Sequence, residues 1–300
     1  MAEASHRCGY VAVVGRPNVG KSTLVNALVG RKVSIVTRRP QTTRHRITGV
    51  ATGPSAQLLF VDTPGLHAVH RRALNRAMNR AAVAALADAD VVALVVEAGR
   101  WTGEDASALG RAVEAGRPLV LVINKVDLVR PREALLPFIR SVSEKAQFLA
   151  IVPVSAERGE NLDRLRGVLE AAMPEGPPLF PAEAVSDRDE RFHAGEIVRE
   201  KLMRRLHDEL PYGLAVEVGR MVADEAGRWE IDAVIWVERE GHKAIVVGKG
   251  GEMLKAVGRA ARLELKERLG APVHLSLWVK VREGWSDRDA DLRRFGYEGE

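Results

Sequence analysis

Residues 15–22, GRPNVGKS, place glycines, a lysine and a serine at the spacing of a phosphate-binding loop, G-x-x-x-x-G-K-S/T. The glycines let backbone N–H groups point inward at the start of a helix, where negative charge is stabilised. Lys21 would reach the β- and γ-phosphates of a nucleotide, and the Ser22 hydroxyl would bind Mg²⁺. A glycine-rich turn without a ligand is the alternative. The residues of this loop predicted to bind the nucleotide are Gly15, Asn18, Val19, Gly20, Lys21, Ser22 and Thr23.

A second motif, DTPG at residues 62–65, would complete the phosphate site. Asp62 can hold Mg²⁺ through a water molecule, and the Gly65 N–H can donate to the γ-phosphate. A lone D-x-x-G also forms a common β-turn, which is the alternative interpretation. The next residue is Leu66, whose side chain can neither donate nor accept a hydrogen bond. The sequence therefore leaves open what holds a water molecule that attacks a phosphoanhydride.

Two further motifs indicate a guanine base. In NKVD, residues 124–127, the aspartate can accept two hydrogen bonds from the N1–H and N2–H₂ edge of guanine, and adenine offers no such pair of donors. Asn124 would brace the loop, and the aliphatic part of Lys125 would cover the base. In SAE, residues 155–157, backbone N–H groups would donate to guanine O6. The residues predicted to bind the base are Asn124, Lys125, Asp127, Ser155 and Ala156.

The elements that must position these motifs alternate between apolar strand patterns and helical patterns. Strands separated by helices predict an α/β domain with a mostly parallel sheet and helices on both faces. Each motif lies at the carboxyl end of a strand, which is where open parallel sheets bind ligands. Strands are predicted at 10–15, 58–62, 91–97, 119–124 and 150–154, and helices at 21–29, 71–87, 104–115, 131–145 and 162–172.

The order of elements changes after a proline-rich segment, MPEGPPLFP at residues 173–181. Such a segment indicates a helix stop and a linker. Beyond it we predict a small α+β module with a helix at 187–210, strands at 214–222, 229–238, 243–247 and 273–281, and a helix that ends near residue 268. The predicted organisation is a nucleotide-binding domain at 1–173, a linker at 174–186 and a second module at 187–300.

The four motifs, in this order, resemble the GTP-binding signature of the translation-factor branch of P-loop GTPases. Residues 15–30, GRPNVGKSTLVNALVG, and residues 38–49, RRPQTTRHRITG, resemble more closely the Era family, whose members are ribosome-assembly GTPases with an RNA-binding tail. The resemblance implies that residues 41–46 are switch I, whose threonine completes the Mg²⁺ shell when the γ-phosphate is present. Thr42 and Thr43 compete for this role, and we favour Thr43. The predicted Mg²⁺ ligands are Ser22, Thr43 and, through water, Asp62; the predicted catalytic residues are Lys21, Thr43 and Gly65.

The apolar residue at position 66 agrees with the same resemblance, which implies slow intrinsic hydrolysis that needs help. In related families an asparagine at the position of Asn18 helps to bind K⁺ beside the phosphates. A monovalent cation there would offset charge that develops during hydrolysis. We therefore expect GTP, GDP and Mg²⁺ as ligands, with K⁺ or a bound partner as a possible activator.

Residues 246–255, VVGKGGEMLK, place a G-x-x-G loop between an apolar run, predicted as a strand, and a helix. Such a loop can bring backbone N–H groups against the phosphates of single-stranded RNA. The surrounding order of elements resembles a KH domain over residues 187–283. A simple turn followed by a solvated helix face, with glutamates among the basic residues, is the alternative. The residues predicted to bind RNA are Gly248, Lys249, Gly250, Gly251, Lys255, Arg259 and Arg262.

The sequence pattern also predicts the burial of three tryptophans in the second module. Trp236 and Trp278 stand in predicted strands, and we expect both in the core. Trp285 stands in the polar run REGWSDRD, and we expect it to be exposed.

Charge and composition limit the binding partners and the cellular compartment that we expect. The net charge is +5, but residues from Pro181 onward carry 21 Lys and Arg against 24 Asp and Glu, so an RNA site in the second module must be a local basic patch. A single cysteine excludes an internal disulfide. The first ten residues lack the apolar region of a secretory signal, and no apolar run is long enough for a transmembrane segment. We expect a cytoplasmic protein, with possible peripheral association at the inner face of the cell membrane.

The resemblance implies a GTP-hydrolysing switch that binds the 3′ end of small-subunit, 16S-type rRNA and assists assembly of the 30S subunit. Two alternatives stay open at this stage. One is a nucleotide-gated RNA chaperone with negligible hydrolysis. The other is a GTPase whose second module docks on a protein or a membrane surface.

Overall fold

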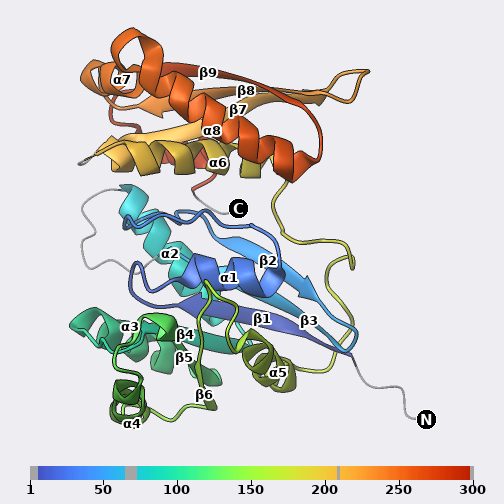
Figure 1. Ribbon diagram of the computed structural model, residues 1–300, viewed down its shortest axis with the longest axis vertical. Coiled ribbons are helices and arrows are strands. Elements are labelled where there is room, and N and C mark those ends of the chain that lie inside the picture. The colour runs from blue at the N-terminus through green and yellow to red at the C-terminus, as the bar shows by residue number, and fades with distance from the viewer. Residues whose placement is uncertain (1–5, 65–72, 208–209, 298–300) are drawn as a thin grey trace. The chain divides into compact units, whose positions relative to one another are not determined.

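The computed structural model describes residues 6–64, 73–207 and 210–297 (Figure 1). Gly65 and Leu66 lie outside these described residues. The chain divides into two compact units: Met1–Val69 with Met78–Asp187, and His70–Ala77 with Arg188–Glu300. Among the described residues, no helix combines the length and the apolar character needed to cross a bilayer.

The first unit is built on a six-stranded sheet in the order β2-β3-β1-β4-β5-β6. All neighbours are parallel except β2 and β3, which are antiparallel. The prediction of a mostly parallel sheet is confirmed. The strands are β1 (Arg7–Val14), β2 (Ile47–Thr52), β3 (Ala56–Asp62), β4 (Val91–Glu97), β5 (Leu119–Asn124) and β6 (Ala150–Pro153).

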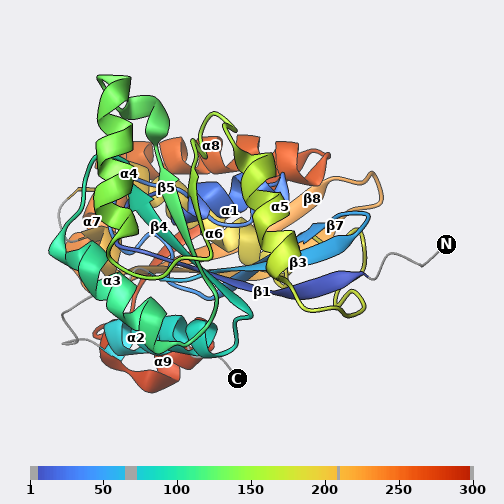
Figure 2. The same cartoon turned by 90° about the horizontal axis from the view of Figure 1, so that it is seen from below.

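Helices cover both faces of this sheet, as Figure 2 shows. One core joins the sheet to α1 (Lys21–Val29) and α5 (Leu162–Ala172), through side chains such as Leu24 and Leu165. The other joins the opposite face to α2, α3 and α4, and here alternate residues of β1 and β4 point to opposite sides. The bounds of these helices are α2 (Ala73–Ala87), α3 (Gly103–Glu114) and α4 (Leu135–Ser143), the last preceded by a 3₁₀ turn, η2 (Arg132–Ala134).

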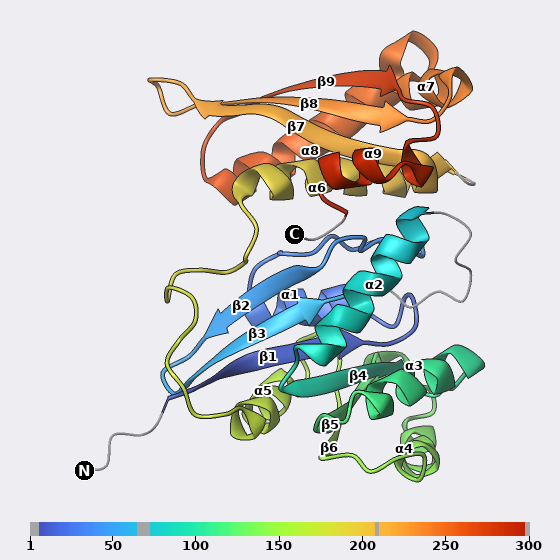
Figure 3. The same ribbon diagram turned by 180° about the vertical axis from the view of Figure 1, so that it is seen from behind.

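The proline-rich segment predicted as a linker is held along the first unit. The Gln57 side chain of β3 binds its backbone three times: Oε1 accepts from the N–H of Leu179 (2.8 Å) and Phe180 (2.9 Å), and Nε2 donates to the Phe180 carbonyl (2.8 Å). Further on, the Val50 N–H of β2 donates to the Val185 carbonyl (3.0 Å). The segment therefore follows the outer edge of the sheet, as Figure 3 shows beside β2.

The second unit has a three-stranded sheet in the order β7-β8-β9, in which β7 and β8 are antiparallel and β8 and β9 are parallel. Helices α6 and α8 pack on one face through a single apolar core that contains Ile197, Ile235 and Leu265. Its elements are α6 (Glu190–Arg205), η3 (Leu210–Gly213), β7 (Leu214–Ala223), β8 (Trp229–Val237), α7 (Glu240–Val247), η4 (Lys249–Gly251), α8 (Glu252–Leu269), β9 (Val273–Val281), η5 (Trp285–Asp287) and α9 (Asp289–Arg294).

Several predicted elements are corrected by the structure. Residues 243–247 are not a strand but the end of α7, so the G-x-x-G loop joins two helices. Strand β2 was not predicted. The helix expected at 187–210 runs from Glu190, after Asp189 caps it by accepting from the Phe192 N–H (2.8 Å), and ends at Arg205.

All three tryptophan predictions were wrong. Trp236 is only partly buried and does not belong to the apolar core; its Nε1–H donates to Glu217 Oε2 (2.9 Å). Trp278 is 47% exposed, because it lies on the face of β9 opposite the helices, whereas Leu277 beside it packs in the core. Trp285 is fully buried. Its Nε1–H donates to the Gly213 carbonyl (3.2 Å), and its ring lies edge-on to Phe295 at 5.3 Å.

Candidate functional site

The phosphate-binding motif forms a tight loop between β1 and α1. Gly15 and Gly20 have φ of +149° and +100°, which side chains on L-residues rarely adopt. A Cβ at Gly15 would lie 2.3 Å from the Val95 carbonyl oxygen, and a Cβ at Gly20 would lie 2.3 Å from Asn124 Nδ2. Both positions therefore require glycine for conformation and for space. The N–H groups at the start of α1 face this loop, the arrangement that suits a phosphate.

Lys21 lies buried inside the loop. Its Nζ donates to the backbone carbonyls of Gly15 (2.9 Å) and Arg16 (3.0 Å). Burial lowers the pKa of Lys21 to about 8, although Asp62 acts in the opposite direction and the Arg16 charge adds to the lowering. The ammonium group is thus desolvated and held by neutral acceptors, a state in which a nearby anionic phosphate would interact strongly with it.

Three oxygen-bearing side chains from separate elements meet beside Lys21. Ser22 Oγ lies 2.9 Å from Thr43 Oγ1, and the Thr43 hydroxyl donates to Asp62 Oδ2 (3.2 Å). Burial raises the pKa of Asp62, while hydrogen bonding to Ser22 and the charge of Lys21 lower it. Asp62 Oδ1 is buried and has no hydrogen-bond partner within the described part of the chain. Hydroxyl and carboxylate oxygens with one such orphaned acceptor fit a site for Mg²⁺.

The two competing threonines are placed differently. Thr43 belongs to the oxygen cluster and is 7% exposed. The Thr42 hydroxyl donates to the Arg39 carbonyl (2.7 Å) and lies 2.6 Å from Thr37 Oγ1. The geometry therefore favours Thr43 over Thr42 as the ligand that completes a Mg²⁺ shell.

Asn124, at the end of β5, joins three of the predicted motifs. Its Nδ2 donates to the Val19 carbonyl (2.9 Å), and its Oδ1 accepts from the Ala156 N–H (3.0 Å). This 2% exposed amide therefore connects the phosphate loop to both loops predicted to bind the base, as a bracing role requires.

Lys125 and Asp127 of the NKVD motif are both held by polar contacts. Lys125 has φ of +64°, and its Nζ donates to the Asn18 carbonyl (2.7 Å). Asp127 is 7% exposed, with one carboxylate oxygen 3.4 Å from Arg158 Nε.

The two N–H groups predicted to meet guanine O6 are already engaged. That of Ser155 donates to the Glu160 carbonyl (3.2 Å), and that of Ala156 donates to Asn124 Oδ1 (3.0 Å). A bond to O6 from either group must therefore be shared or must replace one of these.

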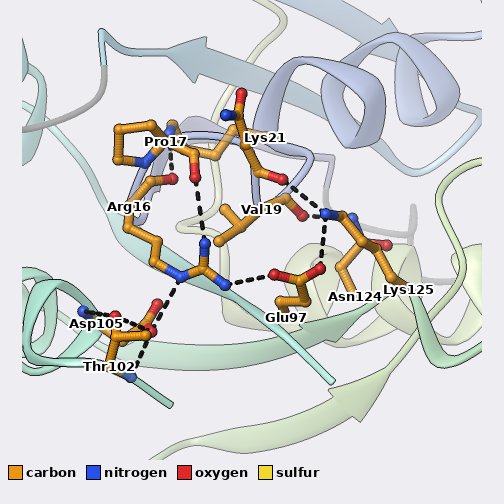
Figure 4. Close-up of polar contacts among 10 residues, drawn as sticks. Arg16, Pro17, Val19, Lys21, Glu97, Thr102, Asp105, Asn124 and Lys125 are labelled. Carbon is orange, nitrogen blue, oxygen red and sulfur yellow. Dashed lines mark hydrogen bonds and ion pairs between the residues drawn. The ribbon is translucent and has the colours of Figure 1, made fainter. Parts of the chain in front are cut away.

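Figure 4 shows a polar network below the phosphate loop that motif matching missed. Arg16 is 7% exposed and lies between Glu97 and Asp105, with Nη2 2.5 Å from Glu97 Oε2 and Nε 3.1 Å from Asp105 Oδ2. The other Glu97 oxygen accepts from Lys125 Nζ (3.0 Å). The arginine of the motif thus faces two carboxylates.

A second glycine-rich loop, in the second unit, has the predicted G-x-x-G geometry. Gly248, Gly250 and Gly251 have φ of +73°, +60° and +80°. A Cβ at Gly248 would lie 2.7 Å from Met253 Cβ, but one at Gly250 would meet nothing within 4 Å. The remaining loop residue, Lys249, is exposed at the start of η4, which precedes α8.

The basic residues that follow lie along α8. Lys255, Arg259 and Arg262 are all exposed. Glu264, which could have neutralised this face, instead forms an ion pair with Lys201 of α6. One of the interleaved glutamates therefore has a partner outside this basic face, whereas Glu252 and Glu267 stay exposed on α8.

The comparisons with known proteins agree with this geometry. A family model described as 50S ribosome-binding GTPase matches residues 10–125, and one described as KH domain matches residues 209–286. The chain is 55% identical over 297 residues to GTPase Era of Stenotrophomonas maltophilia (strain K279a), covering 99% of both chains. The chain belongs to the Era family of GTPases.

Two solved Era structures are similar over almost the whole chain. Era in complex with MgGDPNP and nucleotides 1506–1542 of 16S ribosomal RNA is 40% identical, with a TM-score of 0.93 and coverage of 98% of this chain and 100% of that one. A single-residue variant of Aquifex aeolicus Era bound to GDP·AlF₄⁻ gives the same values. The resemblance to the Era family and the fold predicted from the sequence, a P-loop GTPase domain followed by a KH domain, are confirmed.

As an Era-family enzyme, this chain binds guanine nucleotides with Mg²⁺ and hydrolyses GTP. The network around Arg16 could have been found in part from the sequence. TGED at residues 102–105 matches a helix N-cap with an acidic third residue, and the structure forms that reciprocal capping box between Thr102 and Asp105. Nothing in the sequence marked Glu97 as a partner of Arg16.

Proposed function

We propose that this chain is a GTP-driven switch that binds the 3′ end of small-subunit rRNA and assists assembly of the 30S subunit. The observation that carries the nucleotide part is the cluster of Ser22, Thr43 and Asp62 beside Lys21. In this cluster Thr43, which belongs to the segment predicted to be switch I, contacts Ser22 and Asp62 of the phosphate site. Order in that segment can therefore depend on the γ-phosphate.

In this proposal Lys21 and the loop N–H groups bind the phosphates, while Ser22, Thr43 and, through water, Asp62 hold the metal. Mg²⁺, when bound, neutralises charge on the β- and γ-phosphate oxygens. Asp127 selects guanine, Asn124 braces the three loops, and Lys125 covers the base. Gly65, which lies outside the described residues, keeps its predicted contact with the γ-phosphate.

Thr43→Ala tests the switch part, and Thr42→Ala is its matched control. Thr43→Ala should weaken Mg²⁺-dependent binding of a non-hydrolysable GTP analogue about tenfold, because one metal ligand is lost, with GDP affinity unchanged. Thr42→Ala should keep wild-type affinity for both. Equal losses for GTP and GDP in Thr43→Ala, or a larger loss in Thr42→Ala, would contradict the assignment.

Hydrolysis needs a source of stabilising charge, since Leu66 offers no polar atom. We propose K⁺ near Asn18, an exposed loop residue with φ of +64°. Single-turnover hydrolysis should be faster in K⁺ than in Na⁺, and faster again with ribosomal RNA. Equal rates under all four conditions would exclude both activators.

The RNA part of the proposal is supported by the second glycine-rich loop and its basic helix. Gly248, Gly250 and Gly251 would bring backbone N–H groups to the RNA phosphates. Positive charge along the same RNA strand would come from Lys249, Lys255, Arg259 and Arg262. The similar Era structure holds nucleotides 1506–1542 of 16S ribosomal RNA, which is why we propose that segment here.

Crosslinking and sequencing of RNA bound to a GTP-locked sample tests this partner. Reads should concentrate at the 3′ end of small-subunit rRNA and should decrease when GDP is loaded. Reads spread over unrelated RNA would contradict the proposed target. We place this activity in the cytoplasm, where ribosomal subunits are assembled; peripheral association with the membrane stays a prediction.

A further inference from the structure

The polar network around Arg16 forms a closed path that begins and ends in the phosphate loop (Figure 4). Arg16 binds Glu97 at the end of β4. Glu97 binds Lys125 of the NKVD motif, and Lys125 Nζ returns to the loop at the Asn18 carbonyl (2.7 Å). One carboxylate therefore connects the loop predicted to hold phosphates with the loop predicted to hold the base.

The ionic groups in this path are partly removed from water. Glu97 receives two cations on separate oxygens, at 2.5 Å from Arg16 Nη2 and 3.0 Å from Lys125 Nζ. Burial raises the pKa of Glu97, but the hydrogen bonds from Arg16 and Lys125 outweigh it and leave that pKa below its usual range. The carboxylate therefore stays charged at neutral pH, and both bonds are charge-assisted.

The path holds two residues in a strained backbone conformation. Asn18 and Lys125 both have φ of +64°, in the left-handed region that non-glycine residues seldom adopt. Such residues keep this conformation only where the surrounding contacts fix it. The bond from Lys125 Nζ to the Asn18 carbonyl joins the two directly, and Glu97 holds the lysine that makes it.

Asp105 anchors the other side of Arg16. Its Oδ2 accepts from Arg16 Nε (3.1 Å), from the Thr102 N–H (2.9 Å) and from the Thr102 hydroxyl (2.8 Å). Asp105 is fully buried at the start of α3. It fixes the arginine to a helix end, but it touches no residue of the NKVD motif through these bonds.

We propose that Glu97 is a positioning residue that couples recognition of the guanine base to recognition of the phosphates. The proposal rests on the guanine-nucleotide site described above. Glu97 acts through Lys125, whose anchored side chain fixes the loop that carries Asp127. Without that anchor, Asp127 loses its alignment with the 2-amino group of guanine. Asp105 supports only the phosphate side of the same path.

The test compares binding of GDP and IDP, since inosine lacks the 2-amino group that Asp127 would accept from. Glu97→Gln keeps the size of the side chain and removes its charge. It should weaken GDP binding about tenfold and reduce the GDP/IDP affinity ratio about fivefold, because the base contact loses alignment. Asp105→Asn should weaken both nucleotides equally and keep the ratio. Fluorescence titration at fixed salt and Mg²⁺ measures both affinities for the wild type and for each variant.

Glu104→Gln is the matched control, since Glu104 is exposed beside Asp105 on the same helix turn. It should leave both affinities and the ratio unchanged. If Glu97→Gln does not fold, as judged by circular dichroism, Glu97→Asp replaces it. That variant keeps the charge but is one methylene too short to reach both cations, so it should lower the ratio in the same direction.

A GDP/IDP ratio that stays at the wild-type value in a folded Glu97 variant would overturn the proposal. So would a fall in Asp105→Asn as large as that in Glu97→Gln. Failure of the underlying nucleotide site gives a different result, because the wild-type protein would then show no preference for GDP over ADP or IDP before any substitution is made.

Discussion

The two glycine-rich loops of this chain both precede a helix, yet they differ in how firmly they are held. In the phosphate loop, a Cβ on Gly20 would lie 2.3 Å from Asn124 Nδ2, and Lys21 is buried. In the G-x-x-G loop, the space around Gly250 is open and Lys249 is exposed. The first loop is organised in advance for one compact ligand, whereas the second presents an adaptable edge to a polymer.

Gly20→Ala should give the largest effect. The new Cβ collides with Asn124 in a backbone conformation that alanine avoids, so the loop must rearrange. We expect guanine-nucleotide affinity to fall more than about 100-fold, as strain of about 3 kcal/mol or more implies. Isothermal titration calorimetry measures it, and circular dichroism of the same sample confirms that the protein is folded. Affinity within about threefold of wild type would show that the loop is not as rigid as the geometry indicates.

Replacing both Lys249 and Gly250 with Asp should come next. Two negative charges would face the RNA phosphates, so RNA affinity should fall about 30-fold or more, with nucleotide affinity intact. Filter binding at one fixed salt concentration is the measurement. A variant with Asp at both Ala223 and Gly227, outside the basic patch, controls for added negative charge. Unchanged RNA affinity would argue against the KH assignment of this loop.

The pH dependence of GDP binding tests the burial of Lys21, which distinguishes the phosphate loop from the exposed G-x-x-G loop. Burial lowers the pKa of Lys21 to about 8 in the free protein, and bound phosphates favour its charged form, so binding is accompanied by proton uptake that grows as the pH rises above about 7. The contribution of Lys21 should be nearly constant below pH 7 and should lower the affinity about fourfold between pH 7 and pH 8.5, as the protonated fraction decreases. Lys21→Arg, which stays charged, should remove this dependence while leaving the titration of guanine itself. A flat profile for the wild type would contradict the lowered pKa.

Gly250→Ala should give the smallest effect. No atom lies within 4 Å of the added Cβ, so only the cost of φ at +60° remains. We expect about a twofold loss of RNA affinity, consistent with less than about 1 kcal/mol of strain reaching the bound state. Gly20→Ala is its counterpart at the other loop. A loss as large as that of the double aspartate variant would mean that this loop, too, is rigid.

Much of the fold and of the nucleotide site followed from the sequence, because both depend on strong local signals. Buried parallel strands are continuous apolar runs, and the motif residues are fixed in type by their chemistry. The structure gathers Ser22, Thr43 and Asp62 as those signals indicated, although their roles in binding stay predictions.

The wrong or missing predictions concern residues whose structure and burial depend on tertiary contacts rather than on the local sequence. Residues 243–247, KAIVV, are mostly apolar and rich in β-branched side chains, which suggests a strand, but only Val246 of this helix is buried and the run is too short for its period to be read. Trp285 stands among charged residues and yet is covered by contacts with Phe295 and Tyr297. Glu97 pairs with Arg16 across 81 positions, a separation that no local pattern reports.

The pairing of residues 185–187 with β2 has one more consequence. An outermost strand normally exposes a row of free amides that a neighbouring molecule can extend into an aggregate. Here the chain itself occupies part of that row, through Val185 and Asp187. Residues 185–187 thus cover part of the β2 edge next to the predicted switch I, and without these contacts the same amides could pair with another molecule.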